Sequence, residues 1–367
     1  MELRGWIYHA TKKIQRIDFI IDSKAPQTQI NLPRPEISKK LNLSHCEIGM
    51  YHLSELTSTQ ILKTFKSLVY LEGNDKPIEI ERDIPQNTRV NVKRDISIYN
   101  NHIYTVEDRI NTFAKEVDIF IPFRDESAIL KNCVRSIACR NLSLVRRVVL
   151  INNNSKEKTT ARVLKELTDS FSFLEVLDYN AEFNFSAILN FARLKSNSRF
   201  LLFMNNDIEV LTSNWIEALG KTLNDNKVGI VGPKLLYPDM SIQHSGIIFQ
   251  DLLPRYIWKH YPRTIIPGNK GECLKFNAIT GACFMIKRDI FDSVNGMDEN
   301  LVVTLNDIDL CLKIRKRGLH CIVNQEVEMI HHESVTRDQL DNLKSAKRSI
   351  EEQNYFIKKW QGFNFNL

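Results

Sequence analysis

The sequence of 367 residues lacks the patterns of a disulfide scaffold, a zinc protein or a membrane-spanning protein. Its seven cysteines are an odd number and include no Cys-x-x-Cys pair, so we expect reduced, mostly buried thiols. No apolar run approaches the ~20 residues that cross a bilayer, and no signal region opens the chain. These absences predict a cytoplasmic protein, associated at most peripherally with the inner face of the cell membrane.

Several functional motifs are also missing. There is no Gly-rich phosphate loop, which argues against a P-loop kinase or a dinucleotide dehydrogenase. No Gly-x-Ser-x-Gly elbow of a serine hydrolase is present. The net charge of +6 is spread without a basic stripe, so we expect no nucleic-acid partner but a mild affinity for anions such as nucleotides or phospholipid head groups.

The chain does contain two regions of different pattern. Residues 1–95 hold short alternating runs separated by Pro, Gly and Asn, which predict a small β-sandwich. Residues 96–116 are typical of a linker that ends in a short helix, Val106–Lys115. From residue 117 to 367, apolar strands alternate with helical periodicity, which predicts an α/β domain with a mixed, mostly parallel sheet.

Polar clusters follow three strands of this second domain directly. They are Arg124-Asp125-Glu126, Asn152-Asn153-Asn154-Ser155 and Asn205-Asn206-Asp207. Ligands of such sheets bind at the carboxyl ends of the strands. We therefore expect these clusters to meet at one edge of the sheet.

Two clusters have the chemistry of a metal site. Asn205-Asn206-Asp207 offers amide and carboxylate oxygens, which Mg²⁺ and Mn²⁺ prefer; the alternative is an ordinary turn rich in Asn and Asp. His331-His332 ends a strand-like run, and one imidazole could complete the metal shell, the alternative being a structural pair.

Asp307 and Asp309 begin an amphipathic helix that ends in Lys313, Arg315, Lys316 and Gly318. Acids in the first turn and bases in the last turn match the helix dipole, so both aspartates could be simple capping residues. The functional alternative is that one of them takes a proton from a substrate hydroxyl.

In this order, the clusters resemble the inverting glycosyltransferases of family 2, which have the GT-A nucleotide-sugar fold. The resemblance extends from about residue 117 to 337 and is most similar to bacterial enzymes of O-antigen and surface-polysaccharide synthesis, of rhamnosyl- or galactofuranosyl-transferring type. The segments that carry it are 121–125, 152–155, 183–186, 204–207, 231–235, 280–283, 295–299, 306–310 and 331–334.

The resemblance implies a role for each cluster. Asp207 would bind Mn²⁺ or Mg²⁺ with Asn205, which replaces the first acid of the family's Asp-x-Asp motif, and with His331 (or His332). Asp307 would be the general base, with Asp309 as the less favoured alternative. The residues expected to bind the nucleotide sugar are Pro122, Arg124, Asp125, Asn153, Ser155, Asn184, Ser186, Asn206, Thr280, Gly281 and Ala282.

The implied function is transfer of a sugar from a UDP- or dTDP-linked donor to a saccharide or lipid-linked saccharide. The Gln-x-x-Arg-Trp motif of processive members is absent, so one or a few sugars would be added. One alternative is an inactive GT-A domain that binds a saccharide or a partner, since Asn205 replaces an acid. A nucleotidyltransferase would need a Gly-rich basic loop after the first strand, which is missing.

Overall fold

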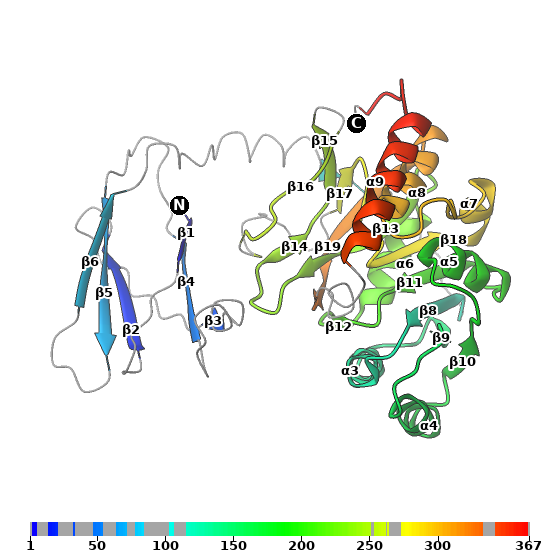
Figure 1. The fold of residues 1–367 in the computed structure, drawn as a ribbon, viewed down its shortest axis with the longest axis horizontal. Coiled ribbons are helices and arrows are strands. Elements are labelled where there is room, and N and C mark those ends of the chain that lie inside the picture. The colour runs from blue at the N-terminus through cyan, green and yellow to red at the C-terminus, as the bar shows by residue number, and fades with distance from the viewer. Residues whose placement is uncertain are drawn as a thin grey trace. The chain divides into compact units, whose positions relative to one another are not determined.

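The computed structural model describes most of the second domain and six short strands of the first. The described ranges beyond residue 100 are 103–105, 115–250, 253–261, 263, 273–332 and 342–365. The chain divides into two compact units, Met1–Ser97 and Ile98–Leu367 (Figure 1).

The first unit contains two antiparallel sheets of three strands each. β1 (Glu2–Gly5), β4 (Glu47–Leu53) and β3 (Leu32–Pro33) form one sheet, and β2 (Ile14–Ile20), β5 (Thr64–Leu71) and β6 (Ile78–Asp83) form the other. The alternating runs of residues 17–21, 67–71 and 78–80 overlap β2, β5 and β6, and the packing of the two sheets as a β-sandwich stays a prediction.

The second unit is built on one mixed sheet of eleven strands. Its main order is β10-β9-β8-β11-β18-β13-β19-β17-β7, with β12 paired to β19 and β14 paired to β13. The strands are β7 (Ile103–Tyr104), β8 (Val117–Phe123), β9 (Val145–Asn152), β10 (Leu174–Asp178), β11 (Phe200–Met204), β12 (Ile208–Val210), β13 (Val228–Leu236), β14 (Ile242–His244), β17 (Cys273–Phe276), β18 (Cys283–Lys287) and β19 (His320–His331). A separate hairpin joins β15 (Ile247–Gln250) to β16 (Leu253–Tyr256).

The first four strands of the order are parallel, and antiparallel strands enter at β18. This arrangement confirms the predicted α/β class. β7 lies inside the predicted linker but pairs with β17 as an edge strand. The helix predicted over Val106–Lys115 falls almost wholly outside the described residues.

Helices cover both faces of the sheet because the side chains of each strand alternate between them. Phe120 belongs to a buried cluster that includes residues of α5 (Phe185–Leu194), α7 (Arg288–Ser293), α8 (Asn306–Lys316) and α9 (Asn342–Lys359). Ile119 and Ile121 belong to a second buried cluster, with residues of α3 (Ser127–Ala138), α4 (Thr160–Ser170) and α6 (Trp215–Asn224). The long run of buried side chains in β8 is thereby explained, and the C-terminal end of α9 contacts the first turn of α8 through Lys359 and Asp309.

Helix α8 differs from its prediction in exposure. Seven of its eleven residues are buried, so the helix is enclosed on most sides and is not the amphipathic surface helix that the sequence suggests. α9 causes this enclosure, since Phe356 and Trp360 pack into the same core as Leu310 and Ile314.

Five of the six cysteines that the structure describes are buried, and all six are free thiols, as predicted; Cys139 is exposed. Burial raises the pKa of the Cys273 thiol to about 11, so this group stays protonated at neutral pH. Among the described residues, no helix is long and apolar enough to cross a membrane.

Candidate active site

The loops after β8 and β9 are joined through Asp125. Its backbone N–H donates to Ser155 Oγ at 2.8 Å, and its Oδ1 accepts from the N–H groups of Lys156 and Glu157 at 2.5 and 2.8 Å. Asp125 has a φ of 56°, in the left-handed region that aspartate tolerates better than most residues. The predicted meeting of these two loops at the sheet edge is therefore observed.

Asn153 extends the same edge to the loop after β10. Its side chain is 2% exposed, and its Nδ2 donates to the carbonyls of Tyr179 and Ala181 at 3.0 and 2.9 Å. Arg124 is exposed beside this surface, whereas Pro122 is buried within β8 opposite Ile151. Pro122 is therefore part of the buried strand, and its contact with a nucleotide stays a prediction.

Asn184 and Ser186 form contacts that the sequence does not suggest. Asn184 caps α5 by accepting the N–H of Ala187 at 3.1 Å, and its Nδ2 donates to the carbonyl of Glu299 at 2.9 Å. Ser186 Oγ donates to the carbonyl of Leu301 at 2.5 Å. These side chains anchor the segment that leads to α8, and their role in the nucleotide crevice stays a prediction.

The predicted metal residues Asp207 and His331 lie side by side. The antiparallel pairing of β12 with β19 places Ile208 opposite His331, so that Asp207 Oδ1 lies 3.2 Å from His331 Nε2. His332 points elsewhere: its Nε2 lies 2.9 Å from Glu209 Oε1. The structure therefore pairs Asp207 with His331 rather than with the fallback His332.

The orientation of His331 suits a metal ligand. Gln243 Nε2 donates to the His331 carbonyl at 3.2 Å, which leaves Gln243 Oε1 to accept from Nδ1–H of the ring at 2.5 Å. In this tautomer, Nε2 carries a lone pair and faces a carboxylate oxygen, so a proton or a cation is needed between them.

Two neighbouring ligand atoms of an octahedral cation, each about 2.1 Å from it, lie about 3 Å from each other. The distance of 3.2 Å between Asp207 Oδ1 and His331 Nε2 fits this value. No group of three or more His, Cys, Asp or Glu side chains that could hold a metal occurs among the described residues. A cation here would therefore take its remaining ligands from water, an amide such as that of Asn205, or a substrate diphosphate.

The predicted base, Asp307, is held by backbone groups. Its Oδ2 accepts the N–H of Gly281 at 2.7 Å, and its Oδ1 accepts the N–H of Ile308 at 2.8 Å. Both bonds, together with the N-terminus of α8, favour the ionised carboxylate. A Cβ at Gly281 would lie 3.1 Å from Asp307 Cβ, so a side chain there would crowd this contact.

Asp309 has a different environment. It is fully buried, and its Oδ1 accepts from Trp360 Nε1 at 2.8 Å and lies 2.7 Å from Lys359 Nζ. Lys313 Nζ lies 3.7 Å from Oδ2. Because α9 covers it, Asp309 holds two helices together and is not placed to receive a substrate proton.

α9 also fixes the loop before the base. Glu352, which is 3% exposed, accepts the N–H groups of Val303 and Thr304 at 3.2 and 2.5 Å. Leu305 follows with a φ of 63°, a strained conformation for leucine that costs roughly 1–3 kcal/mol. Packing of α9 therefore stabilises the backbone that presents Asp307.

One turn, Thr280-Gly281-Ala282, joins the metal residues to the base. The N–H of Asn205 donates to the carbonyl of Ala282 at 2.8 Å, because β11 and β18 pair up to Met204 and Cys283. The next residue toward the N-terminus, Gly281, binds Asp307. We call Thr280–Ala282 the catalytic turn, since its backbone contacts both predicted centres.

His244 contacts this turn from the other side. Its Nε2 accepts the N–H of Thr280 at 3.3 Å, and burial lowers the pKa of its imidazole to about 3. The ring therefore stays neutral at physiological pH. Neither His244 nor Gln243 has a sequence signal, because their partners lie 36 and 88 residues away.

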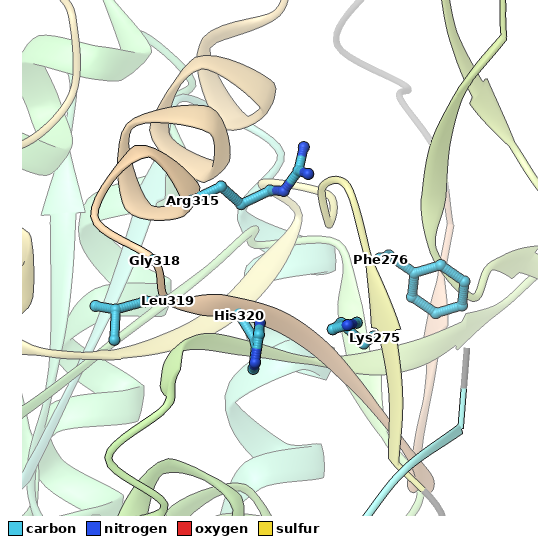
Figure 2. A pocket seen from close by; sticks show the side chains of 6 residues that line it. All are labelled: Lys275, Phe276, Arg315, Gly318, Leu319 and His320. Atoms are coloured by element: carbon cyan, nitrogen blue, oxygen red, sulfur yellow. The ribbon is translucent and has the colours of Figure 1, made fainter. Parts of the chain in front are cut away.

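The described part of the chain also has a pocket away from these residues. Figure 2 shows it between the C-terminal end of α8, the start of β19 and the end of β17. No predicted site residue lines it, and Asp307 lies at the opposite end of α8, ~14 Å away along an 11-residue helix. The lining residues are Lys275, Phe276, Arg315, Gly318, Leu319 and His320.

Parts of this chain are similar to known proteins. Residues 118–294 match the family model described as glycosyl transferase family 2. An uncharacterized protein of Sinorhizobium fredii is 32% identical over 68% of this chain, and the O-antigen biosynthesis protein RfbC of Myxococcus xanthus is 30% identical over 60% of it. The chain spans only 28% and 18% of the lengths of these two relatives.

A more distant relative is the N-acetylglucosaminyl-diphospho-decaprenol L-rhamnosyltransferase of Mycobacterium tuberculosis, 24% identical over 34% of this chain and 44% of its own length. Two solved structures share the fold with a TM-score of 0.52 each. One is a mannosyltransferase of Pyrobaculum calidifontis in complex with GDP-Man and Mn²⁺, at 13% identity over 73% of this chain and 71% of its own. The other is GalNAc-T7 with UDP, GalNAc and Mn²⁺, at 16% identity over 73% and 53%. The chain therefore carries a glycosyltransferase family 2 domain with the GT-A fold.

Proposed function

We propose that this chain transfers a sugar from a nucleotide-diphosphate donor to a saccharide or lipid-linked saccharide, with inversion, in bacterial surface-polysaccharide synthesis. The catalytic turn is the observation that carries the proposal. The N–H of Gly281 in this turn binds Asp307, the proposed base, and the carbonyl of Ala282 binds the N–H of Asn205, a proposed metal residue. The proposed proton acceptor and the proposed leaving-group site would thereby be positioned by one turn, which supports a single displacement.

In the proposed reaction, Asp307 takes the proton from the acceptor hydroxyl. The acceptor oxygen forms its bond to the anomeric carbon of the donor while the bond from that carbon to the diphosphate breaks. Each oxygen of Asp307 accepts one backbone N–H, which would hold the carboxylate in place for the incoming proton. A positioned base of this kind contributes roughly 10²–10⁴-fold to the rate.

Asp207 and His331, with Asn205 as a further oxygen donor, would hold Mn²⁺ or Mg²⁺. The bound cation would neutralise charge on the departing diphosphate. The support from this chain is the 3.2 Å separation of Asp207 and His331 and the tautomer that Gln243 enforces. The structural neighbours were both solved with Mn²⁺.

The loops that carry Arg124, Asp125, Asn153 and Ser155 would bind the nucleotide. A UDP- or dTDP-linked donor and a polyprenyl-linked acceptor are the finer parts of this proposal. The names of the O-antigen and rhamnosyltransferase relatives support the acceptor class.

The test is nucleotide release from a panel of UDP- and dTDP-sugars with MnCl₂ and an acceptor lipid, using the full chain. Release that needs both acceptor and metal supports the proposal. The alternative, a saccharide-binding domain without activity, rests on Asn205 in place of an acid. Calorimetry with UDP and Mn²⁺ separates the two, because an inactive domain that has lost its metal site should bind neither.

A further inference from the structure

We propose that two neighbouring residues, Gln243 and His244, are positioning residues that fix the two centres of the site separately. Gln243 sets the tautomer of the metal ligand His331, and His244 supports the catalytic turn beneath Asp307. The proposal rests on the function proposed above and goes beyond it, because neither residue belongs to a motif of the resemblance.

Gln243 clamps His331 at two points. Its amide N–H donates to the His331 backbone carbonyl at 3.2 Å, and its carbonyl oxygen lies 2.5 Å from ring Nδ1. The first bond fixes which end of the amide faces the ring. The second therefore makes Nδ1–H the donor to Gln243, so that Nε2 is the ring nitrogen directed at Asp207 and available to a cation. Partners of this kind raise the metal affinity of a histidine ligand.

His244 is nearly inaccessible, at 1% exposure, and acts on the other centre. Its Nε2 accepts the N–H of Thr280, the residue before Gly281, whose own N–H donates to Asp307 Oδ2 at 2.7 Å. The adjacent N–H groups of the turn thus connect a buried neutral imidazole to the base. Loss of the imidazole acceptor would leave the N–H of Thr280 unpaired and loosen the turn.

The two actions are separable because the residues are consecutive on β14. Successive side chains of a strand point to opposite faces of the sheet. Gln243 reaches β19 at His331, whereas His244, opposite Leu235 in the β13 pairing, reaches the turn before β18. One short strand therefore serves both centres without a shared side chain.

For Gln243 the readout is binding of Mn²⁺ alone, measured by the electron paramagnetic resonance signal of free Mn²⁺. Gln243→Leu removes the acceptor, and we expect affinity to fall by about 10- to 100-fold. Gln243→Glu keeps an oxygen at Nδ1–H and should retain the wild-type affinity within a few-fold. Gln353→Leu, an exposed glutamine on α9, is the matched control and should change nothing.

For His244 the readout is turnover at saturating metal and donor. We expect His244→Leu to lower kcat by about 10- to 100-fold with unchanged donor KM and Mn²⁺ affinity, because displacement of a base by a fraction of an ångström impairs only the chemical step. In His244→Gln, the side-chain oxygen lies near the position of Nε2, and kcat should recover. His320→Leu, at the far end of β19, is the matched control.

Wild-type turnover in the same assays tests the proposed function by itself. If the wild type releases no nucleotide with any donor, that function fails, while the Mn²⁺ titrations still test the division of roles. The division is overturned if Gln243→Leu has the Mn²⁺ affinity of the wild type. It is also overturned if His244→Leu lowers the Mn²⁺ affinity as much as Gln243→Leu does. It is also overturned if the kcat of His244→Gln is no higher than that of His244→Leu while both variants have the melting temperature of the wild type.

Discussion

The metal side and the base side of the site are completed in opposite ways. On the metal side, Asp207 and His331 present two acceptor atoms to each other at 3.2 Å, an arrangement that a cation stabilises. On the base side, both oxygens of Asp307 are already held by N–H donors of the chain. The comparison teaches that the chain itself holds the proposed base in place, whereas the proposed metal pair needs a proton or a cation between its two facing atoms.

The largest expected effect follows removal of the base. Asp307→Asn should lower kcat by about 10²–10⁴-fold, because the amide cannot accept the acceptor proton. Mn²⁺ and UDP affinities should remain those of the wild type. Asp169→Asn, an exposed aspartate of α4, is the control. Full transfer activity in Asp307→Asn would assign the base elsewhere.

The second effect separates the metal side from the base side. Asp207→Asn should weaken Mn²⁺ by at least about 100-fold, since loss of a ligand exceeds the 10- to 100-fold loss known for supporting groups. Excess Mn²⁺ should restore part of the turnover, which it cannot do for Asp307→Asn. Titration with Mn²⁺ followed by nucleotide release measures both the affinity and the rescue of turnover. Equal rescue of Asp207→Asn and Asp307→Asn by Mn²⁺ would contradict the separation of a metal side from a base side.

The third effect tests how α9 organises the base side. Glu352→Ala removes the acceptor of Val303 and Thr304 N–H, so we expect a loss of about 2 kcal/mol in stability and a lower kcat. Thermal melting and kinetics at saturating Mn²⁺ check this. The control Glu351→Ala, an exposed neighbour, should be near neutral. A change in Mn²⁺ affinity with unchanged kcat would contradict the assignment of α9 to the base side.

The smallest effect concerns the amide on the metal side. Asn205→Asp restores an acid to the strand end and should tighten Mn²⁺ by a few-fold at most, because Asp207 and His331 already provide charge and geometry. Calorimetry measures the change. A large gain together with new activity would show that Asn205 holds the natural domain in a state that binds metal poorly.

Local pattern predicted much of this fold. The strands β8, β9, β10 and β11 fall within a few residues of their apolar runs, and the resemblance located the GT-A domain. Polar residues directly after these strands could be predicted to meet, because parallel strands share one edge. The contact between Asp125 and Ser155 follows from that rule alone.

Contacts made across long stretches of chain could not be predicted. The burial of Asp309 in the first turn of α8 depends on Trp360, which directly follows α9 and binds Asp309 from 51 residues away. First-turn acids look alike by local pattern, so the preference for Asp307 came from the resemblance, and the burial of Asp309 gives a physical distinction between the two. Gln243 and His244 carry no spacing signal, since their roles come from the order of β14, β13 and β19 in the sheet.

A crystal structure of the full chain with Mn²⁺ and a UDP- or dTDP-sugar analogue tests the central claim most directly. The account predicts an anomalous Mn²⁺ peak between Asp207 Oδ1 and His331 Nε2, with the diphosphate bound to it. The Asp307 carboxylate, still bonded to the N–H of Gly281, should face the anomeric carbon from the opposite side. A metal bound away from Asp207 and His331, or a sugar beyond the reach of Asp307, would contradict it.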